Sequence, residues 1–229
     1  MKIKAIKVQR LYLQVARQLQ DLINEGSLAQ GQRLPSERDL AEQFGVSRPT
    51  VREAMIALEI AGAVEVRSGS GVYVLEQPKK PGKMTDNEDP GPFEILEARG
   101  LIEGEACALA AERITQAQLD TLAELLVAME QENQQEDAHE EADEHFHRCI
   151  AEAAGNSAIS TTIAWLWELR NESEISTRFY QRIREEGIRP IIADHRAILD
   201  ALRRRDPAAA REAMAAHLQR VTEHLLLDQ

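Results

Sequence analysis

The chain has 229 residues, of which 43% are hydrophobic and 4% aromatic, and its net charge is −12. This length allows one large domain or two modest ones, and the low aromatic content favours Ala- and Leu-rich helices over a β-sandwich. No stretch approaches the roughly 20 apolar residues of a membrane span. Cys107 and Cys149 are too few for a disulfide framework. We therefore exclude membrane-spanning and disulfide-rich secreted proteins, and expect a cytoplasmic protein with no membrane partner.

The charge is distributed unevenly along the chain. Residues 1–83 carry 13 Lys and Arg against 9 Asp and Glu, whereas residues 84–229 carry 14 against 30. A mildly basic first part suits contact with phosphates, and an acidic second part helps to keep the protein in solution. Because the first part is only mildly basic, we expect weak non-specific affinity for DNA, which two copies at one DNA site would help to offset.

The first part predicts helices followed by a β-hairpin, in a domain spanning residues 8–76. Apolar residues recur at helical spacing over residues 11–23, and a stretch containing glycine then ends this helix. Ser36 and Ser47 are suited to cap a second and a third helix, each followed by a glycine stop. Valines that alternate on both sides of residues 67–71 predict the hairpin. This order is typical of a winged helix-turn-helix.

Residues 77–91 are rich in proline, glycine and charged residues and predict a linker. Behind it, residues 92–228 have helical periodicity with no competing strand pattern. The expected helices are 93–111, 116–134, 138–154, 157–178, 190–204 and 208–227. The sequence therefore predicts a mainly α protein, with a winged helix-turn-helix of three helices plus a β-hairpin and a C-terminal bundle of six or seven helices.

The third predicted helix carries the side chains that we expect to contact DNA. In a helix-turn-helix this helix enters the major groove by its N-terminal end. Arg48 and Arg52 lie one turn apart and are expected to project to the same side, where a bidentate arginine–guanine contact gives roughly 1–3 kcal/mol of discrimination. Arg38 is expected over the backbone or in the same groove, and the small residues of the hairpin tip suit a minor groove. The expected DNA-binding residues are Arg38, Ser47, Arg48, Thr50, Arg52, Arg67, Ser68 and Gly69.

One carboxylate and three imidazoles lie on the apolar faces of three predicted helices in the second part. The candidate ligands are Asp143, His147, His195 and His217. Such donors suit a divalent metal, with Zn first and Ni or Mn as alternatives, and the ion would offset the cost of burying Asp143. Spacing alone leaves open that these histidines are hydrogen-bonded core residues, or that His139 or His224 is a ligand instead.

The first part resembles a known family. The stretch of residues 34–71 begins with Leu-Pro-Ser-Glu-Arg, continues through Val-Ser-Arg-Pro-Thr-Val-Arg-Glu-Ala and ends with Gly-Ser-Gly. It is similar to the DNA-binding domain of the GntR superfamily of bacterial transcription regulators. The resemblance implies that Arg38, Arg48 and Arg52 contact bases and that Gly69 forms the wing tip. It also implies a homodimer on a palindromic operator with GT and AC half-sites.

The second part resembles the C-terminal ligand-binding (FCD) domain of the FadR subfamily. The motifs that carry this likeness are Glu97-Ala-Arg99 with Glu103, Ala110-Ala111, Asp143-Glu-His-Phe-His147 and Gly155-Asn156. The resemblance implies that Asp143, His147, His195 and His217 bind a divalent metal. It further implies that Arg99 meets the carboxylate of an effector and that Asn156 lies at the pocket.

Residues 89–103 and the Trp165-Leu-Trp167 pair are most similar to hexuronate-utilisation repressors of the UxuR/ExuR type. This likeness implies a sugar-acid effector that meets both the metal and Arg99, with Trp165 and Arg170 at the same cavity. The expected function is a DNA-binding transcription regulator, a repressor of a sugar-acid catabolic operon that a carboxylate releases from its operator, and not an enzyme. The alternatives are another small acid as effector (lactate, pyruvate or an amino acid), or a metal-dependent hydrolase with a DNA-targeting domain.

Overall fold

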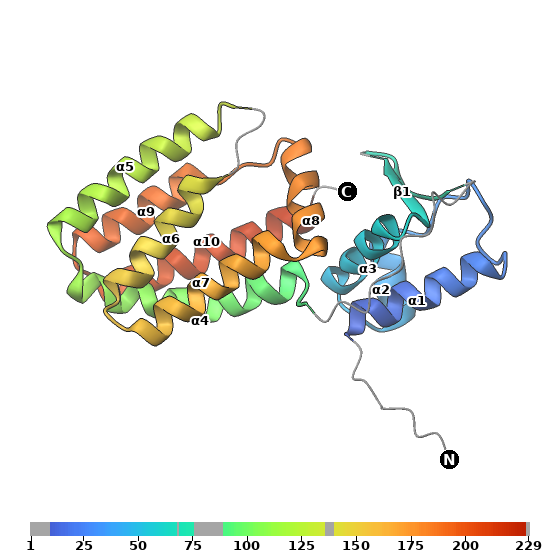
Figure 1. Cartoon of the computed structure of the whole chain (residues 1–229), viewed down its shortest axis with the longest axis horizontal. Helices are drawn as coiled ribbons and strands as arrows, with labels where there is room; N and C mark the ends of the chain where they lie inside the picture. The colour runs from blue at the N-terminus through green and yellow to red at the C-terminus, as the bar shows by residue number, and fades with distance from the viewer. Residues whose placement is uncertain (1–9, 68, 76–88, 136–139, 228–229) are drawn as a thin grey trace, which may run out of the picture. The chain divides into compact units, whose positions relative to one another are not determined.

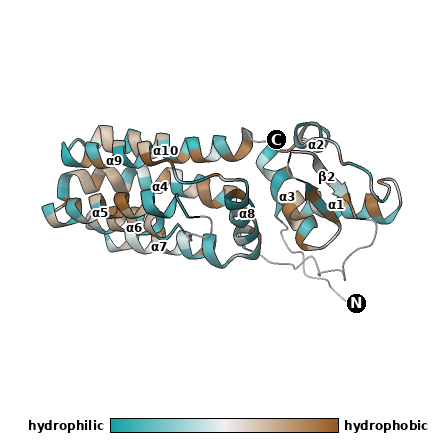
Figure 2. Ribbon diagram, turned by 90° about the horizontal axis from the view of Figure 1, so that it is seen from above, coloured by the Kyte–Doolittle hydropathy of each residue, from teal (hydrophilic) through white to brown (hydrophobic). Residues whose placement is uncertain are grey.

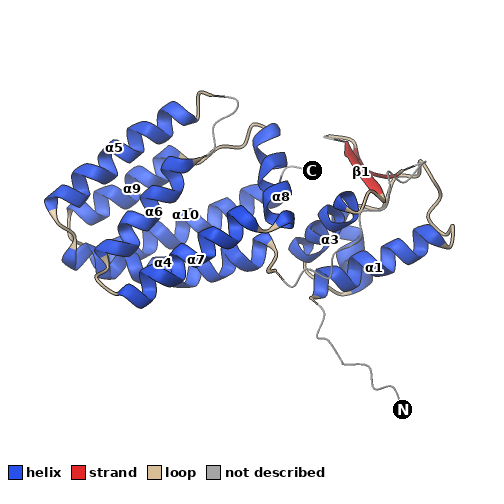
Figure 3. Ribbon diagram, in the orientation of Figure 1, coloured by secondary structure: helices blue, strands red, loops and turns tan. Residues whose placement is uncertain are grey.

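The computed structural model describes residues 10–67, 69–75, 89–135 and 140–227, and the chain divides into two compact units between Phe93 and Glu94 (Figure 1). The described residues are mostly helical and include a single two-stranded sheet, which lies in the first unit (Figure 3). The predicted mainly α fold is therefore confirmed. None of the described helices is both long enough and apolar enough to cross a membrane.

The described part of the first unit holds three short helices and a hairpin. Its elements are α1 (Leu11–Asn24), α2 (Glu37–Phe44), α3 (Arg48–Ile60), β1 (Val64–Arg67) and β2 (Gly71–Val74). Ser36 Oγ accepts the Asp39 N–H at 3.2 Å, and Ser47 Oγ accepts the Thr50 N–H at 3.3 Å. These caps satisfy N–H groups that the helices themselves leave without a partner, which is why α2 and α3 begin where they do.

The wing is an antiparallel hairpin whose apolar side covers the helices. Val64 lies opposite Val74 and Val66 opposite Val72. The backbone of the segment before α2 extends the hairpin, because the Leu34 N–H donates to the Val72 carbonyl oxygen at 2.8 Å. α3 packs against α1, α2 and β1. The N-terminal end of α3 and the wing are thereby held on one small scaffold.

The second unit is an all-helical bundle in its described residues. Its helices are α4 (Pro92–Arg113), α5 (Gln116–Glu132), α6 (Glu141–Ala153), α7 (Ser157–Glu172), α8 (Glu174–Glu185), α9 (Ile192–Arg203) and α10 (Pro207–Leu227). α5 packs on α6 and α9, α9 packs on α10, and α6 packs on α7. Hydrophobic and hydrophilic residues alternate around these helices, as amphipathic packing requires (Figure 2).

The single helix expected over residues 157–178 is two helices in the structure. Ser173 separates α7 from α8 with an extended backbone (φ −66°, ψ 126°), and α8 then runs in a different direction (Figure 1). Residues 170–174 are all polar and interrupt the apolar pattern, but no glycine or proline marks the junction. The expected helix was continued across this polar stretch, although the break determines which side chains α8 contributes to the site below.

Candidate functional site

A groove of about 410 Å³ lies beside the N-terminal end of α3 and the wing. Residues expected to contact DNA border it, among them Arg38, Arg48 and Gly69. Arg33 borders the same groove, and the sequence analysis did not identify it. Its guanidinium lies so close to the start of β2 that a Cβ on Gly71 would come within 2.6 Å of Arg33 Nε. Arg33 belongs to no predicted helix, so helical spacing gave no indication of its position.

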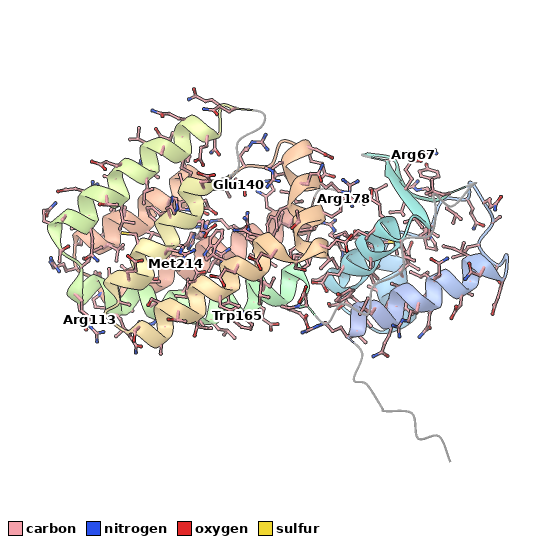
Figure 4. All side chains as sticks on the ribbon, viewed as in Figure 1. Arg67, Arg113, Glu140, Trp165, Arg178 and Met214 are labelled. Carbon is pink, nitrogen blue, oxygen red and sulfur yellow. The ribbon has the colours of Figure 1, made fainter. Side chains whose placement is uncertain are left out.

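The wing and the first turn of α2 present arginine side chains to the outside. The side chains of Arg38 and Arg67 are 84% and 55% exposed, and Arg67 lies on the wing (Figure 4) with its guanidinium 4.4 Å from the centre of the Tyr73 ring. Gly69 at the wing tip has a positive φ of 67°. Ser68 lies outside the described residues. The exposed arginines are suited to phosphates or bases without rearrangement of the fold.

The two arginines of α3, which were expected to project to the same side, differ in exposure. The side chain of Arg48 is 39% exposed, whereas that of Arg52 is 8% exposed. Arg52 Nε donates to Glu37 Oε1 at 2.8 Å, and Arg48 Nη2 lies 3.9 Å from Glu37 Oε2. Arg52 is thus buried against α2, and helical spacing could not show this because spacing gives a direction around the helix and not what covers it.

The hydroxyl groups at the start of α3 are engaged with each other. Ser47 Oγ and Thr50 Oγ1 lie 2.8 Å apart, and both residues remain at the exposed end of the helix. The free N–H groups and positive dipole end of a helix N-terminus attract phosphate. Ser47 and Thr50 therefore lie at the N-terminal end of α3, as expected, and this is the end that would approach a duplex.

In the second unit, one carboxylate and three imidazoles converge. Asp143 and His147 come from α6, His195 from α9 and His217 from α10. All four are buried, and one ligand atom from each lies within 4.8 Å of the others. Asp143 Oδ1 lies 2.8 Å from His195 Nε2 and 3.8 Å from His147 Nε2. The structure therefore brings together the four residues that the sequence proposed.

The atoms that face the centre of this cluster lack hydrogen bonds. Asp143 Oδ1 and the Nε2 atoms of His147 and His195 have no hydrogen-bond partner among the described residues. Buried polar atoms are rarely left so, because the loss of water is otherwise uncompensated. In tetrahedral coordination with bonds of about 2.0–2.1 Å, the ligand atoms lie about 3.4 Å from one another. The four atoms lie within 4.8 Å of one another and the Asp143–His195 pair is 2.8 Å apart, so shifts of about 1 Å bring them to that spacing. The donor set fits a divalent metal.

A second group orients the imidazoles of the cluster. Nδ1 of His147 is hydrogen-bonded to Glu103 Oε2, and Nδ1 of His195 to the Ile191 carbonyl oxygen at 2.9 Å, whereas Nδ1 of His217 lies 3.5 Å from Asp194 Oδ2 without a hydrogen bond. Metal-binding histidines ordinarily use the second ring nitrogen in this way, which fixes the tautomer and the ring orientation. For His147 and His195 the contact leaves Nε2 directed at Asp143.

Burial and neighbouring charges set the protonation of the cluster. Burial opposes ionisation of Asp143, but the adjacent imidazoles of His195 and His147 hold the pKa of Asp143 well below its usual range. Burial lowers the pKa of His217 to about 4. Burial also disfavours charged His195, yet the adjacent Asp143 raises the pKa of His195 above its usual value. Asp143 is thus ionised and His217 neutral at pH 7, which are the forms that bind a metal.

A cavity of about 60 Å³ adjoins the cluster, because Asp143 and His217 line both. The other polar side chains at the cavity are Arg99, Glu140, Arg170, Tyr180, Arg189 and His224. The remaining lining is aliphatic, for example Ile183 from α8 and Val221 from α10. Glu140, at the start of α6, is labelled in Figure 4. The cavity therefore has a charged end beside the cluster and an apolar wall.

Two arginines dominate the charged end of the cavity. The guanidinium groups of Arg99 and Arg170 lie 4.0 Å and 4.9 Å from the centre of the Trp167 ring. Arg99 Nε donates to Glu103 Oε1 at 2.6 Å, and Arg170 Nη2 donates to Glu140 Oε2 at 2.6 Å. Arg99 Nη2 is buried with no hydrogen-bond partner among the described residues. A planar guanidinium with a spare donor is suited to a carboxylate.

Two residues expected at the cavity lie elsewhere. Trp165 is 54% exposed (Figure 4), whereas Trp167 is fully buried, because positions two apart point to different sides of a helix. Asn156 caps α7, and its Oδ1 accepts the Ala158 N–H at 3.0 Å. Neither Trp165 nor Asn156 lines the cavity. Tyr180, which the sequence analysis missed, does line it, and it comes from α8, the helix that periodicity merged with α7.

Of the two alternative metal ligands, only His224 can be placed, because His139 lies outside the described residues. His224 lines the cavity but does not belong to the cluster. Glu103, also missed as a contact of the cluster, supports it from α4; burial opposes its ionisation, but Arg99 and His147 lower the pKa of Glu103 to about 2. Its sequence position, one turn after Arg99, is the indication that could have identified it.

Two family models match consecutive parts of the chain. The model described as bacterial regulatory proteins, gntR family, matches residues 11–74, and the FCD domain model matches residues 94–220. In Escherichia coli (strain K12), the Uxu operon transcriptional regulator is 36% identical over 231 residues, which cover 97% of this chain and 89% of that protein. The Exu regulon transcriptional regulator of the same strain is 36% identical over 215 residues, covering 92% and 83%.

A third relative is named for a different operon. The putative L-lactate dehydrogenase operon regulatory protein of Escherichia coli (strain K12) is 33% identical over 221 residues, covering 92% of this chain and 84% of that protein. All three relatives are regulators by name, and each match extends over both units. The chain therefore belongs to the gntR family of bacterial regulatory proteins, and it is a DNA-binding transcription regulator with a C-terminal FCD domain and not an enzyme.

Proposed function

We propose that this regulator binds a palindromic operator as a homodimer in the bacterial cytoplasm and represses a sugar-acid catabolic operon. A carboxylate effector bound beside a divalent metal releases the protein from the DNA. The observation that carries the proposal is the set of buried donor atoms without partners that adjoins a cavity lined by Arg99 and Arg170 among other residues. The names of the Uxu and Exu regulators support a hexuronate as the effector.

The metal site consists of Asp143, His147, His195 and His217, with Zn as the first candidate and Ni or Mn as alternatives. When bound, the ion supplies a positive charge and open coordination positions for the effector. Asp143 and His217 border the cavity, so an effector in the cavity would lie next to the ion. The protein's own contribution is to hold the donors in place through their second contacts and to keep water away from them.

Arg99 and Arg170 are proposed to bind the carboxylate of the effector. Arg99 Nη2 has no hydrogen-bond partner among the described residues, and both guanidinium groups are fixed against the buried Trp167 ring. Tyr180 Oη is likewise buried without a hydrogen-bond partner in the described structure and is placed to meet a hydroxyl group. These groups would recognise a short acid that carries a hydroxyl near its carboxylate.

A second candidate effector is a smaller acid such as lactate. The cavity of about 60 Å³ and its aliphatic wall suit a short acid without rearrangement, whereas a hexuronate requires the cavity to widen. The relative named for a lactate dehydrogenase operon favours the same candidate. In either case release of the DNA requires that the effector bind one conformation of the dimer better than another, and about 1–3 kcal/mol of coupling suffices.

The test is a mobility shift of the purified protein on a duplex that it selects from a random-sequence library. The complex is titrated in parallel with glucuronate, galacturonate, lactate and pyruvate, before and after removal of metal with a chelator. Release by a hexuronate supports the proposal, and release by lactate alone supports the second candidate. The proposal is wrong if no carboxylate releases the DNA from the metal-loaded protein. Native mass spectrometry of the same preparation identifies the ion.

A further inference from the structure

Each of the two arginines at the charged end of the cavity has a buried carboxylate as its partner. Arg99 is paired with Glu103, and Arg170 Nη2 donates to Glu140 Oε2 at 2.6 Å. The side chains of Arg170 and Glu140 are only 7% and 9% exposed, and both line the cavity. Glu140 therefore places a negative charge on the wall of a site that is proposed to receive an anion, and it is not one of the four candidate metal ligands.

The surroundings of Glu140 fix it in this position. The residue directly precedes α6, and its backbone is left-handed (φ 53°, ψ 35°), which is unfavourable for a residue with a Cβ. Acidic side chains ordinarily lie in solvent, so a buried one in a strained backbone needs compensating contacts. Its partner Arg170 is held in turn, because the guanidinium lies 3.9 Å from the centre of the Tyr180 ring and 4.9 Å from that of Trp167. The Glu140–Arg170 pair is thus a fixed part of the cavity wall.

This pairing decides which groups remain for a ligand. Arg170 has further N–H donors, but Glu140 already balances its charge. Among the residues that the structure describes, Arg99 Nη2 and Tyr180 Oη are buried without hydrogen-bond partners. A third arginine of the lining, Arg189, is partly exposed, and its Nη1 donates to two backbone carbonyl oxygens. The buried end of the cavity therefore offers unused donors for one carboxylate and one hydroxyl group.

We propose that Glu140 makes this receptor select acids with a single carboxylate, because it neutralises Arg170 and repels a second carboxylate. The inference rests on the proposed function, in which an acid occupies the cavity. The cavity is small, about 60 Å³, so a second carboxylate on a ligand held by Arg99 would lie close to Glu140. Like charges that are close together and shielded from water repel strongly, whereas a neutral group at the same position meets no such cost.

The first experiment measures binding of acids to the purified protein by calorimetry, in the absence of DNA. Two matched pairs are compared. Lactate is compared with tartronate, in which a carboxylate replaces the methyl group, and glucuronate is compared with glucarate, in which a carboxylate replaces the aldehyde. The wild type is expected to bind at least one of the two monoacids, and to bind it more tightly than the matched diacid. Equal or tighter binding of the diacid by the wild type would overturn the proposal.

The same measurement is made on E140Q, which keeps the size and the hydrogen-bonding ability of the side chain and removes its charge. E140Q is expected to raise the ratio of diacid to monoacid affinity at least about tenfold. This is a small part of what Coulomb's law gives for unit charges a few ångströms apart at an effective dielectric constant of about 20. E141Q is the matched control, because Glu141 is the next residue and is exposed. An unchanged ratio in E140Q, or an equal rise in E141Q, contradicts the inference.

The second experiment separates charge from packing. R170Q leaves Glu140 charged and unpaired, whereas the E140Q/R170Q double variant carries two amides that can bond to each other. The pair is thus neutral in the wild type and in the double variant, positive in E140Q and negative in R170Q. The ratio of diacid to monoacid affinity is expected to follow this charge, highest in E140Q and lowest in R170Q. Thermal unfolding without ligand identifies any variant that fails to fold, and the remaining variants still give the order. A packing role would weaken both acids of a pair alike and leave the ratio constant.

Failure of this inference and failure of the proposed function give different results. Acids that bind with the expected selectivity but do not release the DNA would contradict the proposed function and support the role of Glu140. Release of the DNA by an acid, with the same affinity ratio in the wild type and E140Q, would contradict the role of Glu140 alone. Absence of binding of all four acids to the wild type would contradict both.

Discussion

The two units of the protein treat a buried carboxylate in different ways. In the first unit Glu37 accepts a charge-assisted hydrogen bond from Arg52 at 2.8 Å, so the charge is compensated by another side chain of the same unit. In the second unit Asp143 Oδ1 faces imidazole Nε2 atoms with no hydrogen bond among the described residues. Since an uncompensated buried charge is costly, the first arrangement is complete without a ligand, whereas a cation could complete the second. A buried ion pair needs no ligand, and a buried set of unpaired donors indicates a candidate binding site.

The largest expected effect is on metal-dependent stability of the second unit. With free metal about 1000-fold above its Kd, binding adds about 4 kcal/mol to the free energy of unfolding. H147A should abolish this increment, measured as the difference between metal-loaded and chelated protein by denaturant unfolding. H145A is the matched control, because His145 is exposed on the same helix. An increment that survives in H147A would contradict the assignment of the cluster.

The next effect concerns the stability of the metal-free protein at acidic pH. Burial lowers the pKa of His217 to about 4. As the pH falls, the unfolded chain therefore binds a proton at this residue at a higher pH than the folded chain does. The stability from neutral His217 is complete above about pH 6.5 and is lost as pH falls toward the folded-state pKa, on the order of 3 kcal/mol. Unfolding of chelated protein between pH 6.5 and 4 measures it. The H217Q variant should lose this dependence, and an unchanged profile in H217Q would count against it.

The third effect tests whether Arg99 recognises a carboxylate. R99K keeps the positive charge but removes the planar guanidinium with its paired donors. It should weaken binding of the effector that releases DNA by about 1.5–3 kcal/mol. Operator affinity without effector should stay unchanged, because Arg99 lies in the second unit. The control is R196K, since the Arg196 side chain is 57% exposed and pairs with Glu130. Equal effector response in R99K and wild type, measured by titrated mobility shift, would remove Arg99 from the site.

The smallest effect separates the two capping serines of the first unit. S36A and S47A each remove a cap and should each lower stability by about 1 kcal/mol. S47A should also weaken DNA binding, because Ser47 caps the helix end that would meet the duplex, whereas S36A should affect stability alone. Thermal unfolding and fluorescence anisotropy with labelled duplex measure the two quantities. Equal loss of DNA affinity in both variants would show that the cap itself has no role at the interface.

The elements that the sequence predicted correctly are those with local physical causes. Ser36 and Ser47 mark the starts of α2 and α3 because their hydroxyls bond nearby N–H groups. The junction at Ser173 was missed because no glycine or proline marks it, and the polar stretch of residues 170–174 was a local indication that was not used. Helix caps can be recognised from the sequence, whereas a change of helix direction that depends on packing cannot.

The residues of the candidate sites could likewise be placed only in part from the sequence. The four residues of the candidate metal cluster were chosen because polar groups on apolar faces are unusual, and the structure brings them together. The sequence could not place Trp165 outside and Trp167 inside, because either side of α7 would have suited an aromatic residue. It also could not show that Glu37 covers Arg52, since that contact joins two helices.

Because helix α7 ends at Ser173, part of the cavity lining comes from a separate helix, α8, that carries none of the four cluster residues. The cluster is carried by α6, α9 and α10, whereas Tyr180 and Ile183 reach the cavity from α8, a short helix that begins after this break. Substitutions along α8 can therefore reshape the cavity without replacing any residue of the cluster. Under the proposed function, related regulators could keep the same cluster and respond to a different nutrient through changes in this single helical segment.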